Sequence, residues 1–193
     1  MSFKDKDSTK KKILQAVSDL LADGNAELGI NRIAARAGVD KVLIYRYFGG
    51  LPGLLTAFAR DGRVWPEFEE IMEASPYVAA MLTPREIGDR FVHGFIRELK
   101  DRPVTQEILR WELERENELT RETATVREER LREHLECHGL DEDNSAVYAL
   151  ITAGLLHLML QAKSSGQFCG LSLRDPDTWE RIERAAMKMI ASK

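Results

Sequence analysis

The stretch from Ile30 to Phe48 constrains the fold more than any other part of the chain. Its apolar residues recur at three- and four-residue intervals over residues 30–37 and again over residues 41–47, which predicts two short helices. Gly38 lies between them, where a glycine can adopt the left-handed conformation that a sharp turn requires. Asp40 is the predicted N-cap of the second helix. Two short helices joined in this way form a helix–turn–helix, which places one helix in the DNA major groove.

A further helix is expected before this stretch. Apolar residues at helical spacing run from Ile13 to Leu21, with a cap expected near Ser8 and an end at Gly24. Residues 1–12 are polar and rich in lysine, which predicts a flexible basic arm.

The sequence Gly-Gly-Leu-Pro-Gly at residues 49–53 predicts a break and a new helix, since proline suits the first turn. We therefore expect an N-terminal domain over residues 1–50 and a C-terminal domain over residues 51–193. The second domain contains a segment at 146–162 that is apolar nearly all round, and an amphipathic helix over 177–191. No strand pattern is visible. The predicted fold is all-α, a trihelical helix–turn–helix domain followed by a helical bundle.

Charge is distributed unevenly along a chain whose formal net charge is -4. Residues 1–63 carry 11 Lys and Arg against 7 Asp and Glu, whereas residues 64–193 carry 17 against 25. A basic first third suits contact with a polyanion such as DNA. The apolar segment 146–162 is shorter than most membrane spans. With two isolated cysteines and no leader pattern, we expect a cytoplasmic protein that does not enter a membrane.

The sequence offers no recognisable catalytic or metal-binding motif. It lacks a G-x-S-x-G sequence, a phosphate-binding P-loop and a dinucleotide fingerprint, and its four histidines form no identifiable catalytic pair. His134 and His138 have the spacing of zinc-binding helices, but no second Cys or His cluster accompanies them. Solvated histidines on a charged helix are the simpler interpretation. We predict no enzyme activity, no catalytic residue, no metal and no cofactor.

Four short motifs lie at linked spacings between Ile13 and Phe58. They are Ile33-Ala34, Ala37-Gly38-Val39, Tyr45-Arg46-Tyr47-Phe48 and Leu54-Leu55. At these spacings the block resembles the N-terminal domain of the TetR family of bacterial transcriptional regulators. The helical remainder is similar to that family's regulatory domain in architecture only. The resemblance implies a homodimer that binds two operator half-sites on double-stranded DNA, about one turn or ~34–36 Å apart.

The resemblance also implies roles for individual residues. The residues 41–43 match positions that face base edges, while Tyr45 and Tyr47 match tyrosines that contact phosphate. The predicted DNA-binding residues are Asn31, Arg32, Lys41, Val42, Leu43, Tyr45, Arg46 and Tyr47.

Three positions depart from the family's usual pattern. Gly29 replaces a capping Ser or Thr, Asp40 replaces a Ser and would repel phosphate, and Leu51 replaces a Lys. Fewer phosphate contacts weaken the sequence-independent part of DNA affinity. The expected replacements are Lys10, Lys11, Lys12, Asn31, Arg32 and Arg36.

Val42 and Leu43 are apolar residues at positions that face bases. Such side chains suit contact with thymine methyl groups, so we expect T-rich half-sites. The alternative is that Leu43 packs inward.

A pocket for a small apolar or amphipathic effector is expected in the C-terminal domain, which the resemblance implies is its regulatory part. The candidate effector-binding residues are Phe68, Met72, Phe91, Phe95, Arg110, Trp111, Glu114 and His157. Two alternatives remain open. Aromatic and Met residues at helical spacing also form ordinary core, and Arg110 with Glu114 forms either a surface ion pair or a polar anchor in the cavity.

Residues 146–162 and 177–191 of two subunits are expected to form a four-helix dimer interface. Its predicted core residues are Ile151, Leu155, Leu158, Trp179, Ile182 and Met189. The sequence thus indicates a dimeric repressor that an effector releases from its operator. The alternatives are an activator, an effector-independent regulator, or a C-terminal domain that binds a protein partner.

Overall fold

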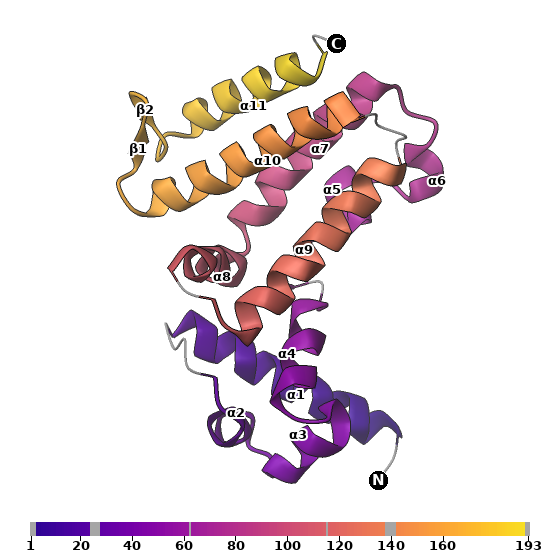
Figure 1. Cartoon of the computed structure of the whole chain (residues 1–193), viewed down its shortest axis with the longest axis vertical. Coiled ribbons are helices and arrows are strands. Elements are labelled where there is room, and N and C mark those ends of the chain that lie inside the picture. Colours follow the sequence, from indigo (N-terminus) through magenta and orange to yellow (C-terminus); the bar gives the residue numbers. More distant parts are fainter. Residues whose placement is uncertain (1–2, 24–27, 62, 115, 138–141, 192–193) are drawn as a thin grey trace. The chain divides into compact units, whose positions relative to one another are not determined.

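The computed structural model describes residues 3–23, 28–61, 63–114, 116–137 and 142–191 (Figure 1). In chain order the helices are α1 (Phe3–Ala22), α2 (Ile30–Ala37), α3 (Lys41–Phe48), α4 (Leu51–Ala59), α5 (Phe68–Met72), α6 (Pro76–Ala79), α7 (Pro84–Lys100), α8 (Pro103–Glu114), α9 (Glu118–Cys137), α10 (Glu142–Lys163) and α11 (Pro176–Ala191). Two short strands, β1 (Gln167–Phe168) and β2 (Leu171–Ser172), lie between α10 and α11. The all-α prediction is therefore confirmed apart from one small hairpin.

The chain divides into two compact units. The first contains Met1–Trp65 and Pro103–Arg127, and the second contains Pro66–Arg102 and Glu128–Lys193. The boundary expected after residue 50 lies inside the first unit, because α4 packs against α3 and α8 packs against α1. The division into a DNA-binding and a regulatory domain remains a prediction.

The helix–turn–helix forms as the sequence predicts. Gly38 ends α2 in the left-handed region at φ 65° and ψ 37°, and its N–H donates to the carbonyls of Ala34 and Ala35. The carboxylate of Asp40 accepts a hydrogen bond of 2.8 Å from the backbone N–H of Val42. The turn and the cap together fix where α3 begins.

The predicted flexible arm is wrong over residues 3–12, because α1 begins at Phe3 rather than near Ser8. Lysine is a good helix former, and Asp5 in the first turn interacts favourably with the helix dipole. Apolar residues later in α1 pack in the core and hold the helix in place. The polar segment before them can therefore be helical although it has no apolar periodicity. The expected end at Gly24 lies outside the described residues.

The core of the helix–turn–helix region comes from all four N-terminal helices. Its least exposed side chains are Ile13, Val17, Leu21, Ile33, Ile44, Leu54 and Phe58. Gly53 allows α4 to begin close behind α3, because a Cβ at this position would lie 1.8 Å from the carbonyl oxygen of Phe48. Only glycine fits this junction without a backbone shift.

Helix α8 and the first part of α9 belong to the same unit as the helix–turn–helix. The indole N–H of Trp65 donates to the carbonyl of Thr123 at 3.1 Å, and the Thr56 hydroxyl donates to Glu122 at 2.8 Å. Arg127 forms an ion pair with Glu112. These contacts join α4 and the segment after it to residues far along the chain.

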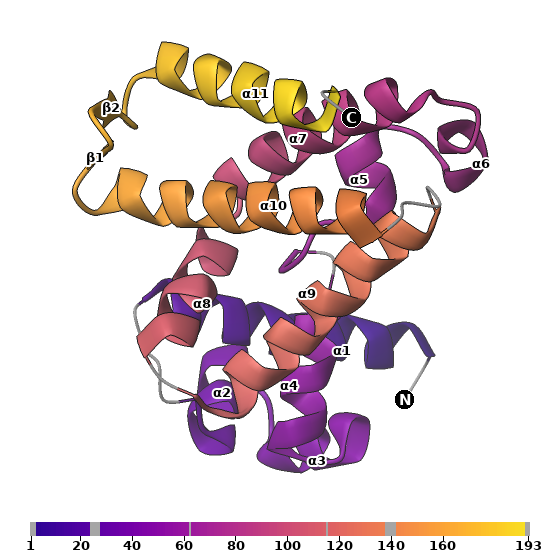
Figure 2. The same ribbon diagram turned by 45° about the horizontal axis from the view of Figure 1, so that its top comes forward.

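The second unit is built around α7. Helix α5 packs against it so closely that a Cβ at Gly94 would lie 1.8 Å from the carbonyl oxygen of Ile71. Helix α11 packs along α7, where Gly88 meets Ile190. Helices α10 and α11 run side by side in opposite directions and are joined through the hairpin (Figure 2).

The hairpin corrects the expectation that the chain forms no strand. Gln167 pairs with Ser172 and Phe168 with Leu171 in antiparallel register. The turn residues Cys169 and Gly170 have φ values of 49° and 77°. Positive φ at both central residues is what a tight two-residue hairpin turn needs. Strands of two residues cannot show alternation, so no sequence pattern marks them.

Helix α10 is longer than expected. Its 22 residues exceed the apolar segment, and Asn144–Lys163 has the length and composition of a membrane span, so the length argument against a span was wrong. Core helices of soluble proteins meet the same criteria. Tyr148, Ile151 and Leu155 are buried within the second unit, yet Leu150 is 68% exposed. The expectation that both faces of α10 are buried does not hold within one chain.

Candidate nucleic-acid interface

Helix α3 turns one face to the core and the opposite face to solvent. Successive residues of an α-helix are separated by about 100° around its axis. Ile44 is fully buried, and Phe48 lies on the same side, half-buried. Val42 and Arg46 are on the opposite side, and both are exposed. Among the predicted base-reading residues, Val42 is therefore the apolar side chain that lies furthest from the core.

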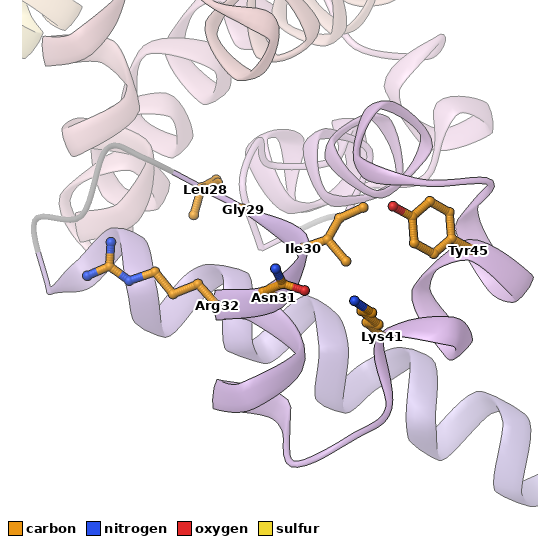
Figure 3. Close-up of a pocket in the computed structure, with 7 residues that line it drawn as sticks. All are labelled: Leu28, Gly29, Ile30, Asn31, Arg32, Lys41 and Tyr45. Carbon is orange, nitrogen blue, oxygen red and sulfur yellow. The ribbon is translucent and has the colours of Figure 1, made fainter.

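One flank of α3 faces an open groove of about 560 Å³ (Figure 3). Its lining residues are Leu28, Gly29, Ile30, Asn31, Arg32, Lys41 and Tyr45. The Lys41 ammonium and the Tyr45 hydroxyl point into the space beside Asn31, whereas the Arg32 guanidinium extends away from it (Figure 3). The structure thus brings Asn31, Lys41 and Tyr45 together. Their ammonium, amide and hydroxyl groups are donors suited to a phosphate.

The other flank of α3 carries Leu43 and Tyr47, which are both half-buried. The ammonium groups of Lys6 and Lys10, from α1, each lie 5.9 Å from a ring centroid, over Tyr47 and Phe48 respectively. Leu43 and Val42 are thus not equivalent, although they are adjacent apolar residues. The half-burial of Leu43 favours the alternative that it packs partly inward.

The basic residues expected to replace missing phosphate contacts lie in different surroundings. Arg36 forms a 2.5 Å ion pair with Asp23, which raises the pKa of its guanidinium. Lys11 and Lys12 line a separate groove of about 900 Å³ together with Arg63. Of the three lysines, Lys10 is the one that lies beside the reading helix.

The candidate effector residues are divided between the two units. Phe91 and Phe95 are stacked with ring centroids 5.3 Å apart, and with Met72 they are buried in the second unit. Phe68 belongs to the same aromatic group through His134. Trp111, also buried, belongs to the first unit.

The polar candidates for effector binding lie on the surface. Arg110 is exposed and forms ion pairs with Glu107 and Glu114 on its own helix, and the bond to Glu107 contributes most to raising its pKa. His157 is exposed and contacts the ring of Phe168 edge-on, at 5.2 Å between centroids. These positions favour a surface ion pair over a polar anchor at Arg110.

His134 and Tyr148 are residues of the aromatic group that the sequence did not predict. The interpretation of His134 as solvated is wrong, because it is 3% exposed and its ring centroid lies 4.4 Å from that of Phe91 and 6.0 Å from that of Tyr148. The sequence contained a signal for the burial of His134, because Leu119 and Val126 occupy the same face of α9. His138 lies outside the described residues, among which no group of three potential metal-ligating side chains is found.

Burial raises the pKa of Tyr148 to about 12, and the nearby carboxylate of Asp89 acts in the same direction. The phenol therefore stays protonated throughout the physiological range. It provides one hydroxyl within an otherwise aromatic cluster.

The residues predicted for the dimer interface divide into three groups by their exposure. Ile151, Leu155 and Trp179 are buried within their own chain, whereas Met189 is 49% exposed. Leu158 and Ile182 are half-buried. The exposed face of α10 instead presents Leu150, Ala153, Gly154 and His157.

A capped helix–turn–helix whose second helix turns one face to solvent, within an all-α chain, is typical of DNA-binding regulators. The family model described as bacterial regulatory proteins, tetR family, matches residues 13–58. The matched residues include the whole helix–turn–helix, so this part of the chain is similar to the DNA-binding part of that family.

Two solved structures have a similar fold over nearly the whole chain. A TetR-like transcriptional regulator from Rhodococcus sp. RHA1 is 18% identical, with 96% of this chain and 97% of that chain covered and a TM-score of 0.60. A TetR transcriptional regulator from the same organism is 16% identical, with 98% and 99% covered and a TM-score of 0.57. Among curated proteins, none matches the chain.

Proposed function

We propose that the protein is a homodimeric cytoplasmic repressor that leaves its operator when a small apolar or amphipathic effector binds its C-terminal region. The observation that carries the DNA-reading role is the outward face of α3, where Val42 is 54% exposed and Arg46 is exposed beside it. Exposed apolar side chains cost free energy in water, so Val42 gains by contact with a thymine methyl group. Arg46 supplies donors to base edges or phosphates.

The dimer is supported by the outer face of α10. Leu150, Ala153, Gly154 and His157 recur at helical spacing on this face, and Met189 adds an exposed apolar group from α11. Small residues among larger ones let a second helix approach closely. A stable dimer is expected to bury more than ~1,000 Å² in total.

The effector role is supported by the aromatic cluster of the second unit. Phe91 and Phe95 supply apolar area, while His134 and Tyr148 supply polar atoms inside it. An aromatic or amphipathic small molecule fits such chemistry. Effector and DNA then weaken each other's binding by the same factor, with a coupling free energy of typically ~1–3 kcal/mol.

Selection of bound sequences from random double-stranded DNA tests the function directly. We expect two half-sites about one helical turn, ~34–36 Å, apart, each with at least one thymine in its core. Val42→Ala should relax the preference at that thymine by roughly tenfold, because the two methyl groups it removes contribute about 0.8 kcal/mol each. Failure to enrich any sequence would contradict DNA reading, and a core of G·C pairs alone would contradict the role of Val42.

The effector step is tested separately with the selected operator. A library of small aromatic and amphipathic compounds is screened for loss of DNA binding by the intact protein. A compound that releases the operator should also bind more weakly when operator DNA is present. If no compound affects binding and the operator lies in front of genes that the protein switches on, the activator alternative is favoured.

A protein partner is a second candidate for the C-terminal region. Tyr77, Val78 and Met81, on α6 and the turn after it, are 74%, 46% and 67% exposed. Such a group of exposed apolar side chains is a typical feature of interaction sites. In-cell photo-crosslinking from position 77, compared with position 113 on α8, would favour this candidate if only position 77 gives a defined product.

A further inference from the structure

We infer that the first turns of α1 form a phosphate-binding edge of the DNA-binding surface, with Lys6 and Lys10 as its cations. This edge lies on the flank of α3 opposite the Asn31–Lys41–Tyr45 groove. The inference rests on the proposed DNA-binding function and adds a second set of contacts to it. The sequence indicated Lys10 only as one of several replacement phosphate contacts on a flexible arm, and it did not indicate Lys6.

The position of Lys6 and Lys10 is set by the helix that replaces the expected flexible arm. They are four residues apart, so their side chains lie on one face of α1, about 6 Å apart along its axis. This face meets the second half of α3, where each ammonium lies over a ring, Tyr47 or Phe48. A disordered arm would give these two ammonium groups no defined position, whereas α1 holds both of them beside α3.

The distances favour a role beyond holding α1 against α3. At 5.9 Å from a ring centroid, each ammonium is near the outer limit of a cation–π contact. Lys6 is exposed, and Lys10 buries part of its stem and is half-buried. Their heads can therefore reach outward to an anion while their stems cover the rings.

Their charges are not neutralised within the described part of the chain, where no ion pair engages Lys6 or Lys10. Arg36 and Arg63 differ, since each pairs with a carboxylate, Asp23 or Asp61. Lys11 and Lys12 point to another side of α1 and share their groove with Asp7 and Asp61. Lys6 and Lys10 thus combine a fixed position beside α3 with a charge that no described carboxylate offsets.

The geometry of the major groove gives these two flanks different partners. The groove is about 12 Å wide and is bordered by the backbones of both strands. A reading helix that turns Val42 and Arg46 to the bases presents one flank to each border. Lys41 and Tyr45 then contact one strand, while Lys6, Lys10 and the hydroxyl of Tyr47 contact the other.

Salt dependence of binding to a mixed-sequence duplex of about 30 base pairs tests this inference without knowledge of the operator. The logarithm of the association constant is measured by fluorescence anisotropy between about 50 and 200 mM salt. Lys6→Gln/Lys10→Gln should make the slope shallower by about 0.9 for each phosphate that the variant no longer neutralises. Lys11→Gln/Lys12→Gln removes the same charge from the face of α1 that lines the separate groove with Asp7 and Asp61. Contrary to the expectation from the sequence that Lys11 and Lys12 contact phosphate, it should leave the slope nearly unchanged. Lys6→Arg/Lys10→Arg should keep the slope of the original protein.

Ethylation interference on a selected operator gives a second measurement. The original protein should show phosphate contacts on both strands that border each half-site. Lys6→Gln/Lys10→Gln should keep the contacts on the strand of Lys41 and Tyr45 and should lose those on the other strand that are not made by Tyr47. A melting curve for each variant establishes that α1 and the core remain folded.

The outcomes separate the inference from the function on which it rests. If the original protein binds the duplex and Lys6→Gln/Lys10→Gln binds with the same slope, the phosphate-binding edge is refuted. It is also refuted if Lys11→Gln/Lys12→Gln causes an equal change in slope, because net charge alone then explains the effect. If the original protein binds no DNA at all, the proposed function itself fails.

Discussion

Asp40 stabilises the start of α3, but its negative charge is unfavourable for the proposed binding of DNA. Its carboxylate caps α3 through the N–H of Val42, yet the proposed position of the DNA backbone places phosphate near it. Asp40→Ser keeps a capping oxygen and removes the negative charge. We expect its free energy of unfolding to stay within about 0.5 kcal/mol of the original, while DNA affinity at low salt rises by roughly fivefold per half-site.

Asp40→Ala is the matched control for the cap. It removes charge and cap together, so it should lower the free energy of unfolding by about 1 kcal/mol. Denaturant unfolding and anisotropy titrations measure both quantities. If neither variant binds DNA more tightly than the original protein, the phosphates do not lie near the start of α3.

Tyr148 should make stability depend on pH in the alkaline range. Its pKa is about 12 in the folded chain against an ordinary value of 10.0. Between these values the unfolded chain loses its phenol proton while the folded chain keeps it. The stabilisation that Tyr148 contributes is therefore complete below pH 10 and is lost as the pH rises towards 12.

Tyr148→Phe removes the ionisable hydroxyl and keeps the ring. We expect this variant to lose less stability than the original protein between these pH values. Ultraviolet titration of phenolate should show one of the four tyrosines ionising last, and that step should be absent from the variant. Simultaneous ionisation of all tyrosines would contradict the buried position of Tyr148.

Residues whose roles depend on their immediate neighbours were predictable from the sequence. Gly38 and Asp40 act through the backbone one to four positions away, so the pattern around them sufficed. The surroundings of Leu43 and His134 depend on helices distant in sequence. The different exposure of Leu43 and Val42 and the aromatic partners of His134 therefore required the folded structure, although the apolar face of α9 indicates the side on which His134 lies.

At the scale of elements, the close contact between α5 and α7 depends on a missing side chain. Gly94→Ala would place a Cβ 1.8 Å from the carbonyl oxygen of Ile71, and backbone atoms cannot turn aside as a side chain can. We expect the variant to lose roughly 3 kcal/mol of unfolding free energy and about 6–12 °C in melting temperature.

Gly154→Ala is the control when both substitutions are made in a Leu150→Glu background, which should be monomeric. In a single chain no described atom lies within 4 Å of a Cβ at that position of α10. Alanine is a better helix former than glycine, so this variant should be as stable as the original or up to about 1 kcal/mol more stable. Calorimetry of the two variants compares them directly. Equal stability of both would mean that α5 can move away from α7 at little cost.

Element boundaries were predictable where turn chemistry marks them. Helices α2 and α3 have the predicted bounds to within one residue, because Gly38 and Gly49 end them. The start of α1 was missed because nothing in its polar first turns signals an end of helix. The hairpin was missed because its pairing involves four residues only.

At the scale of the whole molecule, the proposed dimer can be tested with two exposed leucines. Leu150 on α10 is 68% exposed and Leu113 on α8 is 76% exposed. Substitution by Glu should leave the fold of a single chain nearly unaffected at either position. Leu150→Glu should convert the dimer to a monomer and weaken operator binding, because it places a charge in the interface. Leu113→Glu should remain dimeric.

Sedimentation of the three proteins at micromolar concentration measures the outcome. A monomer for the original protein would refute the dimer, and a dimer for Leu150→Glu would place the interface elsewhere. The predicted core residues Ile151 and Leu155 could not be separated from Leu150 by sequence. All three suit an apolar helix, and only the packing of α10 within the second unit shows which of its faces the chain itself covers.

The outward face of α3 has a consequence for how such a protein can change over evolutionary time. Val42 and Arg46 have little contact with the core, while Gly38, Asp40 and Ile44 hold the helix in place. The two outward positions are therefore free to vary while the framework stays constant. With the proposed role of these residues, exchanging the two side chains would redirect the protein to a different DNA sequence and leave the fold unchanged.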